Sequence, residues 1–160
     1  MTIHFLSAGG TIDKVYFDAK SEFQVGPPQV AEILKLGNVG FTYESSSVLK
    51  KDSLEMTDAD RANIRRAVEA VPGERIVITH GTDTMADTAR ALLGIPGKTI
   101  VLTGAMEPAR LRDSDAPFNV GCAVAAVQTL PPGVYVAMNG QVFPAEHVRK
   151  NREARRFEES

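Results

Sequence analysis

The chain has few of the residues that stabilise small secreted or metal-bound domains. Of its 160 residues one is a cysteine, Cys122, and three are histidines. A single cysteine excludes an internal disulfide framework, and the scarcity of cysteine and histidine argues against a zinc site. Because Cys122 precedes the apolar run at 123–127, we expect it to be a buried structural thiol.

An excess of one charge and long hydrophobic runs are also lacking. There are 18 basic and 20 acidic side chains, a formal net charge of −2, whereas a dedicated nucleic-acid binder needs a strong basic excess. No stretch approaches the roughly 20 apolar residues of a membrane span. The first residues carry neither the basic region nor the apolar stretch of a signal peptide. We therefore expect a cytoplasmic protein that binds neither nucleic acid nor membranes.

Short apolar runs alternate with amphipathic stretches along the whole chain, which we expect to form one domain over residues 1–160. Near-continuous apolar strands between helices are typical of an α/β fold with a mostly parallel sheet and helices on both faces. Thr57 and Asp60 have the spacing of a capping box, and Ser114 or Asp115 is expected to cap the helix that begins at Pro117. The predicted strands are 3–7, 41–49, 76–79, 99–102 and 134–137, the predicted helices are 30–36, 57–71, 83–93 and 117–130, and the predicted polar loops are 12–26 and 104–116.

Glycine-rich polar segments follow three of these strands, at 9–11, 80–84 and 104–106. In such a sheet ligands bind at the carboxyl ends of the strands, where glycines permit sharp turns and close approach. Thr11 and Thr82 would then expose their hydroxyls at the site. Taken alone, each segment favours a structural turn, and no glycine-rich nucleotide-binding motif is present.

Several segments together resemble the L-asparaginase/glutaminase family, the threonine-dependent amidohydrolases. Residues 7–12 (SAGGTI) resemble its first signature, and residues 77–85 (VITHGTDTM) resemble its second nearly residue for residue. Further matching segments follow in order at 102–108, 115–119, 136–139 and 147–150. The resemblance covers essentially the whole chain.

The resemblance implies a nucleophile and an activating constellation. Thr11 would attack the amide and form an acyl-enzyme, and Thr82, Asp83 and Lys150 match the family's Thr-Asp-Lys set. A threonine hydroxyl is a weak nucleophile that needs a base within hydrogen-bond reach, and a lysine serves as one only when its environment lowers its pKa. Without the resemblance, Lys150 reads as part of a solvated charge run.

The resemblance also implies substrate contacts. Ser53 matches the serine that binds the substrate carboxylate, and the turns at Gly81 and Ala105 would supply backbone N–H groups. Glu55 could accept from the substrate ammonium, although its neighbour Leu54 cannot hydrogen-bond. The resemblance makes His80 a structural neighbour of the site, while His4 and His147 have no motif and are expected at the surface or in the core.

Two departures from the family concern how the substrate is held. Members continue into a smaller C-terminal domain that supplies a carboxylate for the substrate ammonium, often across a subunit interface. We expect either a naturally short form or a grip supplied within a homo-oligomer, a dimer or higher. The family's mobile loop also carries a tyrosine that bonds the nucleophile, where this sequence has Phe23; Tyr16 is the expected substitute.

We therefore predict a flavodoxin-like three-layer α/β domain that hydrolyses L-asparagine to L-aspartate and ammonia through a Thr11 acyl-enzyme. No motif implies a cofactor or a metal. Two alternatives stay open: the same residues acting on L-glutamine or another small amide, and a non-catalytic module that binds an amino acid.

Overall fold

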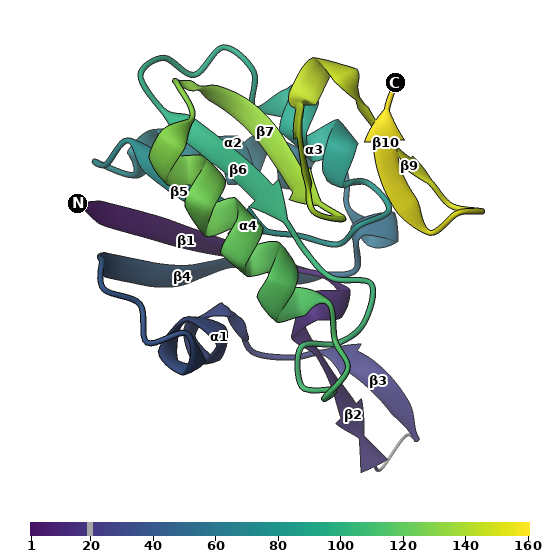
Figure 1. Ribbon diagram of the computed structural model, residues 1–160. Coiled ribbons are helices and arrows are strands. Elements are labelled where there is room, and N and C mark those ends of the chain that lie inside the picture. The colour runs from purple at the N-terminus through teal and green to yellow at the C-terminus, as the bar shows by residue number, and fades with distance from the viewer. Residues whose placement is uncertain (19–20) are drawn as a thin grey trace.

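The computed structural model describes residues 1–18 and 21–160 and has a six-stranded sheet at its centre (Figure 1). The strand order is β4-β1-β5-β6-β7-β8; the first five strands are parallel and β8 is antiparallel to β7. The parallel strands follow the doubly wound, flavodoxin-like order, which confirms the predicted fold class. The six strands are β1 (Thr2–Gly9), β4 (Thr42–Lys51), β5 (Arg75–Thr79), β6 (Thr99–Thr103), β7 (Gly133–Met138) and β8 (Gln141–Pro144).

Helices cover both faces of this sheet, so the molecule has three layers (Figure 1). Consecutive residues of β5 are fully buried and point alternately to the two faces: Ile76 and Ile78 into one core cluster, Val77 into the other. The helices α2 (Asp58–Ala70) and α3 (Met85–Ala91) cover the first face, and α1 (Val30–Leu36) and α4 (Ala116–Thr129) cover the second.

The predicted helix caps are present. Asp60 N donates to Thr57 Oγ1 at 3.2 Å and Thr57 N donates to Asp60 Oδ2 at 2.9 Å, which completes the capping box of α2. Lys51 Nζ also donates to Asp60, at 2.8 Å, and this bond lowers the pKa of the Asp60 carboxyl. At α4 the capping oxygen is that of Ser114, which accepts from Ala116 N at 3.0 Å.

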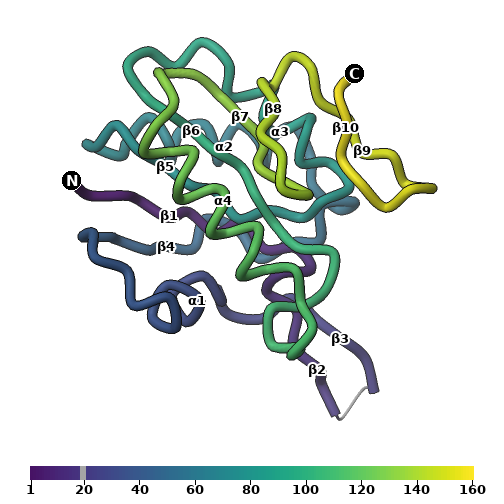
Figure 2. Tube along the Cα trace, viewed as in Figure 1, coloured from purple at the N-terminus to yellow at the C-terminus, as the bar shows by residue number. Residues whose placement is uncertain are grey.

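The prediction of a polar loop over 12–26 is wrong. A 3₁₀ turn, η1 (Thr11–Asp13), leads into an antiparallel hairpin of β2 (Lys14–Phe17) and β3 (Glu22–Val25); residues 19–20 of the predicted loop lie outside the described residues. Cross-strand pairing, with Tyr16 opposite Phe23, stabilises strands that polar composition hides. We call β2 and β3 the arm, because they project from the body at the end of β1 (Figures 1 and 2).

The charge run around Lys150 is not a solvated helix face. After η4 (Ala145–His147) it forms a second hairpin of β9 (Val148–Asn151) and β10 (Arg156–Glu159). Lys150 pairs with Phe157, and Phe157 is fully buried in the core. Alternation of an apolar residue with charged ones is a strand pattern, which the density of charge conceals.

Single residues depart from the predictions in smaller ways. Cys122 is half-buried rather than buried, since it lies on the flank of α4 between exposed Gly121 and buried Ala123. His4 is buried, and His147 is exposed. Within residues 1–18 and 21–160, no helix has both the length and the apolar character needed to cross a membrane.

Candidate active site

The turn after β1 brings Thr11 to the edge of the sheet. Gly9 and Gly10 have φ values of 94° and 89°, a left-handed conformation that favours glycine. A Cβ on Gly10 would lie 2.3 Å from Gly81 N, so the backbones of the two signature turns touch. This contact sets Thr11, which is partly exposed, beside the turn that carries Thr82. The strand order reverses between β1 and β5, which is where doubly wound sheets bind ligands.

The turn after β5 and the strand β9 join Thr82, Asp83 and Lys150. Lys150 Nζ donates to Thr82 Oγ1 at 2.7 Å and to Asp83 Oδ1 at 2.8 Å. The lysine side chain is only 14% exposed and that of Asp83 is 28% exposed, so the pair is partly shielded from water. We call these three residues the Thr-Asp-Lys cluster. Residues 68 positions apart in the chain thus meet at one point.

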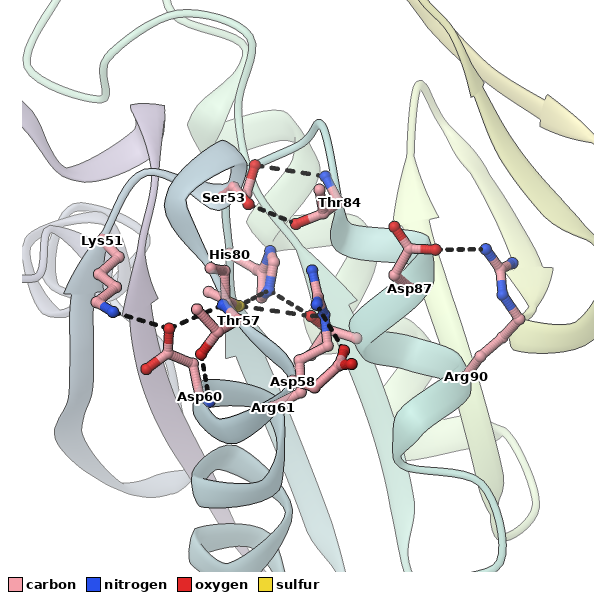
Figure 3. A network of polar contacts seen from close by, with 12 residues as sticks. Lys51, Ser53, Thr57, Asp58, Asp60, Arg61, His80, Thr84, Asp87 and Arg90 are labelled. Carbon is pink, nitrogen blue, oxygen red and sulfur yellow. Dashed lines mark hydrogen bonds and ion pairs between the residues drawn. The ribbon is translucent and has the colours of Figure 1, made fainter.

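Ser53 lies against the same turn, as predicted for a substrate-binding serine. It begins η3 (Ser53–Glu55), and a Cβ on Gly81 would lie 2.7 Å from its Oγ. Its carbonyl accepts from Thr84 Oγ1 at 2.8 Å and its Oγ accepts from Thr84 N at 3.4 Å (Figure 3). These bonds fix η3 to the turn after β5.

His80 supports this turn from below. It is fully buried, and burial lowers the pKa of its imidazole to about 4. Its Nδ1 lies 2.7 Å from Gly81 O and its Nε2 lies 2.8 Å from Thr88 Oγ1. A neutral ring with its proton on Nδ1 satisfies both contacts, since it donates to the carbonyl and accepts from the hydroxyl. Arg61 Nε donates to the same hydroxyl at 3.2 Å and completes the network (Figure 3).

The turn after β6 closes the third side of the site. Ala105 is buried, and a Cβ on Gly104 would lie 2.3 Å from His80 O. The Asp115 carboxylate accepts from Met106 N at 3.0 Å, and Asn119 Nδ2 donates to Gly104 O at 2.9 Å. These bonds hold the turn between α4 and the turn that follows β5.

Tyr16, Phe23 and Glu55 are not brought into this arrangement. The side chains of Tyr16 and Phe23 are 53% and 47% exposed on the arm, with ring centroids 5.5 Å apart. Across the described ranges, the Tyr16 hydroxyl makes no hydrogen bond to Thr11. Glu55 is exposed on η3 beside Ser53, and Leu54 is 64% exposed.

Two residues near the site have no counterpart in the sequence analysis. Arg152 Nε lies 3.5 Å from Asp83 Oδ1, so a second cation lies beside this carboxylate. Asp13, two residues after Thr11, is buried and accepts from Ser7 Oγ at 2.7 Å. Arg152 is hidden in the charge run, while a carboxylate at position 13 between two strands was a signal that could have been weighed. In the part of the chain that the structure describes, no three His, Cys, Asp or Glu side chains are grouped to hold a metal ion.

Known proteins with similar sequences are amide hydrolases by name. The chain is 36% identical over 160 residues to the L-asparaginase of Thermococcus kodakarensis, covering 94% of this chain and 48% of that protein. It is 32% identical over 160 residues to the glutaminase-asparaginase of Acinetobacter glutaminasificans, covering 93% of this chain and 46% of the relative. The chain thus spans about half the length of the curated relatives it matches.

Solved structures give the same result. The thermostable L-asparaginase from Thermococcus kodakarensis superposes with a TM-score of 0.88 at 31% identity, covering 99% of this chain and 51% of that one. A probable cytoplasmic L-asparaginase from Campylobacter jejuni superposes with a TM-score of 0.77 at 30% identity, with the same coverage of both chains. Residues 2–157 match the family model described as asparaginase, N-terminal. The chain belongs to the asparaginase family, and its likeness is to the N-terminal domain.

Proposed function

We propose that this chain hydrolyses L-asparagine to L-aspartate and ammonia through an acyl ester on Thr11. One observation carries the proposal: Lys150 Nζ lies within 2.8 Å of both Thr82 Oγ1 and Asp83 Oδ1. A shielded lysine bonded to a threonine hydroxyl and a carboxylate is the arrangement that activates a hydroxyl or a water for attack on a carbonyl. Membership of the asparaginase family supports the same chemistry.

The reaction has two halves. In the first, Thr11 Oγ attacks the amide carbon, the hydroxyl proton passes to the departing nitrogen, and the C–N bond breaks to release ammonia. In the second, a water activated beside Thr82 and Lys150 attacks the ester carbon, and Thr11 regains its proton as aspartate leaves. The contact between the Gly10 and Gly81 backbones supports both halves, since it keeps the two threonine turns adjacent.

Substrate binding falls to the groups around these turns. Ser53 Oγ is the proposed partner of the substrate carboxylate, and its position against Gly81 supports that role. The backbone at Gly81 and Ala105 is proposed to stabilise the oxyanion. Glu55 is exposed beside Ser53 and is the proposed partner of the substrate ammonium. Tyr16 remains the proposed hydroxyl on the arm.

The test is ammonia release from L-asparagine by the parent and by Thr11→Ala. We expect release by the parent that vanishes in Thr11→Ala, and an ester of aspartate on the peptide that contains Thr11 when the reaction is quenched in acid. Thr42→Ala is the matched control, because Thr42 is exposed at the start of β4 and should leave turnover unchanged. A folded parent that releases ammonia from no amide would overturn the proposal.

Two alternatives are separated by the same assay. The Acinetobacter relative is named a glutaminase-asparaginase, so L-glutamine belongs in the assay beside L-asparagine. Exposure of Tyr16 and Phe23 favours a module that binds an amino acid without turning it over. Such a module would show ligand-induced thermal stabilisation in the parent and in Thr11→Ala alike, with no ammonia from either.

We also propose that residues 1–160 act as one domain in a homo-oligomer within the cytoplasm. Half-length coverage of the relatives supports the sharing of a site between copies, and the Campylobacter neighbour is titled cytoplasmic. Light scattering that gives a monomer at working concentration would contradict the assembly. Recovery of the native protein in a periplasmic fraction would contradict the location.

A further inference from the structure

Asp13 carries a buried carboxyl that the reaction described above does not use. Its residue is 1% exposed, and burial raises the pKa of this carboxyl above its ordinary value. Burying an ionisable group opposes folding unless its contacts compensate. A carboxyl retained in such a place, two residues from the proposed nucleophile, therefore calls for a role.

The Asp13 carboxylate joins two segments that are otherwise separate. Its Oδ2 accepts from Ser7 Oγ at 2.7 Å, on β1, and its Oδ1 accepts from Gln29 N at 2.9 Å, just before α1. Its own backbone adds two more bonds: Asp13 N donates to Gly10 O at 3.1 Å, and Asp13 O accepts from Gly26 N at 2.8 Å. The arm leaves the body immediately after Asp13 and returns at Gly26, so one residue holds both of its ends.

Neighbouring elements brace this junction. Arg110 Nε donates to Gln29 Oε1 at 3.3 Å, and Ala109 N donates to Ile12 O at 3.0 Å, so the loop after β6 is tied to it. Lys50 on β4 is the charged group that acts on the Asp13 carboxylate directly and partly offsets the effect of burial on its pKa. Charge and hydrogen bonds from four parts of the fold thus meet at the base of the arm.

We propose that Asp13 is a positioning residue whose carboxylate fastens the base of the arm to β1 and thereby fixes the arm relative to Thr11. This inference rests on the function proposed for Thr11, but the fastening itself is measurable without any activity. The arm packs mainly through its own pairs, such as Tyr16 against Phe23. Its orientation therefore depends on the bonds at its base.

The first experiment measures the fastening in Asp13→Ala and Asp13→Asn. Amide hydrogen exchange at Gly26 and Gln29 should quicken at least tenfold in Asp13→Ala, and chymotrypsin should cleave faster at the exposed arm residues Tyr16 and Phe23. In Asp13→Asn the side-chain oxygen still accepts from Gln29 N and the amide nitrogen donates to Ser7 Oγ, so exchange should stay within about threefold of the parent. Parent-like exchange and cleavage in Asp13→Ala would overturn the proposal.

The second experiment asks whether the fastening serves the reaction. Asp13→Ala should lower kcat at least tenfold while KM changes less than threefold, because Ser53 lies on a different element, and Asp13→Asn should restore kcat to within threefold. Asp113→Ala is the control, since Asp113 is an exposed loop residue. An unchanged kcat in Asp13→Ala, or no rescue by Asp13→Asn, would overturn the positioning role. A parent that hydrolyses no amide would instead remove the proposed function, and the exchange data would still decide the fastening.

Discussion

The Thr-Asp-Lys cluster and the arm meet at the same edge of the sheet but are built in different ways. The cluster joins the ends of two elements that the core holds, and the Lys150 side chain is only 14% exposed. The arm holds Tyr16 and Phe23 about half exposed, each with the other as its aromatic partner. One half of the candidate site is rigid and the other depends on its attachment.

The difference follows from how each backbone is supported. β5 lies between β1 and β6, hydrogen-bonded on both sides, and Phe157 buries the hairpin that carries Lys150. A lone two-stranded hairpin, by contrast, is marginally stable in water. Activating groups can therefore be fixed in advance on sheet edges, whereas a cover over the substrate has to be anchored separately.

The largest expected effect comes from breaking the cluster. Lys150→Met keeps the length of the side chain but removes both bonds, to Thr82 Oγ1 and to Asp83 Oδ1. We expect kcat for L-asparagine to fall about 10²- to 10⁴-fold, the range for removing an acid–base group. Steady-state ammonia release measures the loss.

Arg149→Met is the matched control for this variant. Arg149 is the preceding residue of β9, is 65% exposed, and pairs with Glu158 at the surface. Its loss should leave kcat within about twofold, because exposed ion pairs contribute little. A Lys150→Met protein that is as active as Arg149→Met would remove the cluster from the mechanism.

The sequence predicts the sheet and the cluster because both depend on local patterns. Apolar runs and glycine turns identified β1, β5, β6 and β7 with their helices, and the parallel order placed Thr11 and Thr82 at one edge. The resemblance of 147–150 to the family singled out Lys150, which the charge run alone would have hidden. Its contact with Thr82 is then a consequence of the fold.

The hairpins and the anchoring of the arm could not be read from the sequence. β2 and β3 are polar, so their pairing depends on cross-strand partners rather than on burial. The bond between Asp13 and Gln29 spans 16 residues, and nothing in either segment alone indicates it. Long-range polar contacts of this kind become visible only when the topology is known.

Acid should weaken the cluster side before the arm. The unfolded state protonates His80 near its ordinary pKa of 6.5, whereas burial lowers the pKa to about 4 in the folded protein. The stabilisation by the neutral ring is therefore complete above pH 6.5 and is lost as the pH falls toward 4. We expect this group to lower the free energy of unfolding by about 3 kcal/mol over that window, measured by denaturant titration.

Two observations decide this prediction. His147→Gln, which alters an exposed histidine, should keep the pH dependence of the parent. In the parent, ring resonances of His80 should stay those of a neutral imidazole down to pH 5. Protonation of His80 at pH 6 without unfolding would contradict the network drawn around Gly81 and Thr88.

Two threonines test how completely the sheet edge is satisfied. Thr79 and Thr103 are opposite each other on β5 and β6, and both are buried. Thr103 Oγ1 donates to Ala137 O at 2.8 Å, whereas Thr79 Oγ1 has no hydrogen-bond partner in residues 1–18 and 21–160. Replacement by valine should destabilise at Thr103 by about 1 kcal/mol and stabilise at Thr79 by a similar amount. Denaturant unfolding of both variants measures it, and equal destabilisation would refute the difference.

The smallest expected effect concerns the arm itself. Tyr16→Phe removes the hydroxyl proposed to act on Thr11 but keeps the ring against Phe23, so the arm should fold as before. Because one hydrogen bond contributes about 1 kcal/mol net, we expect kcat to fall about fivefold for L-asparagine, far less than in Lys150→Met. Phe23→Tyr in the same background tests whether position 23 can supply the missing hydroxyl, and recovery of kcat would transfer the role from Tyr16 to that position. If Tyr16→Phe matches the parent in kcat, the arm contributes no chemistry, and the site consists of the strand ends alone.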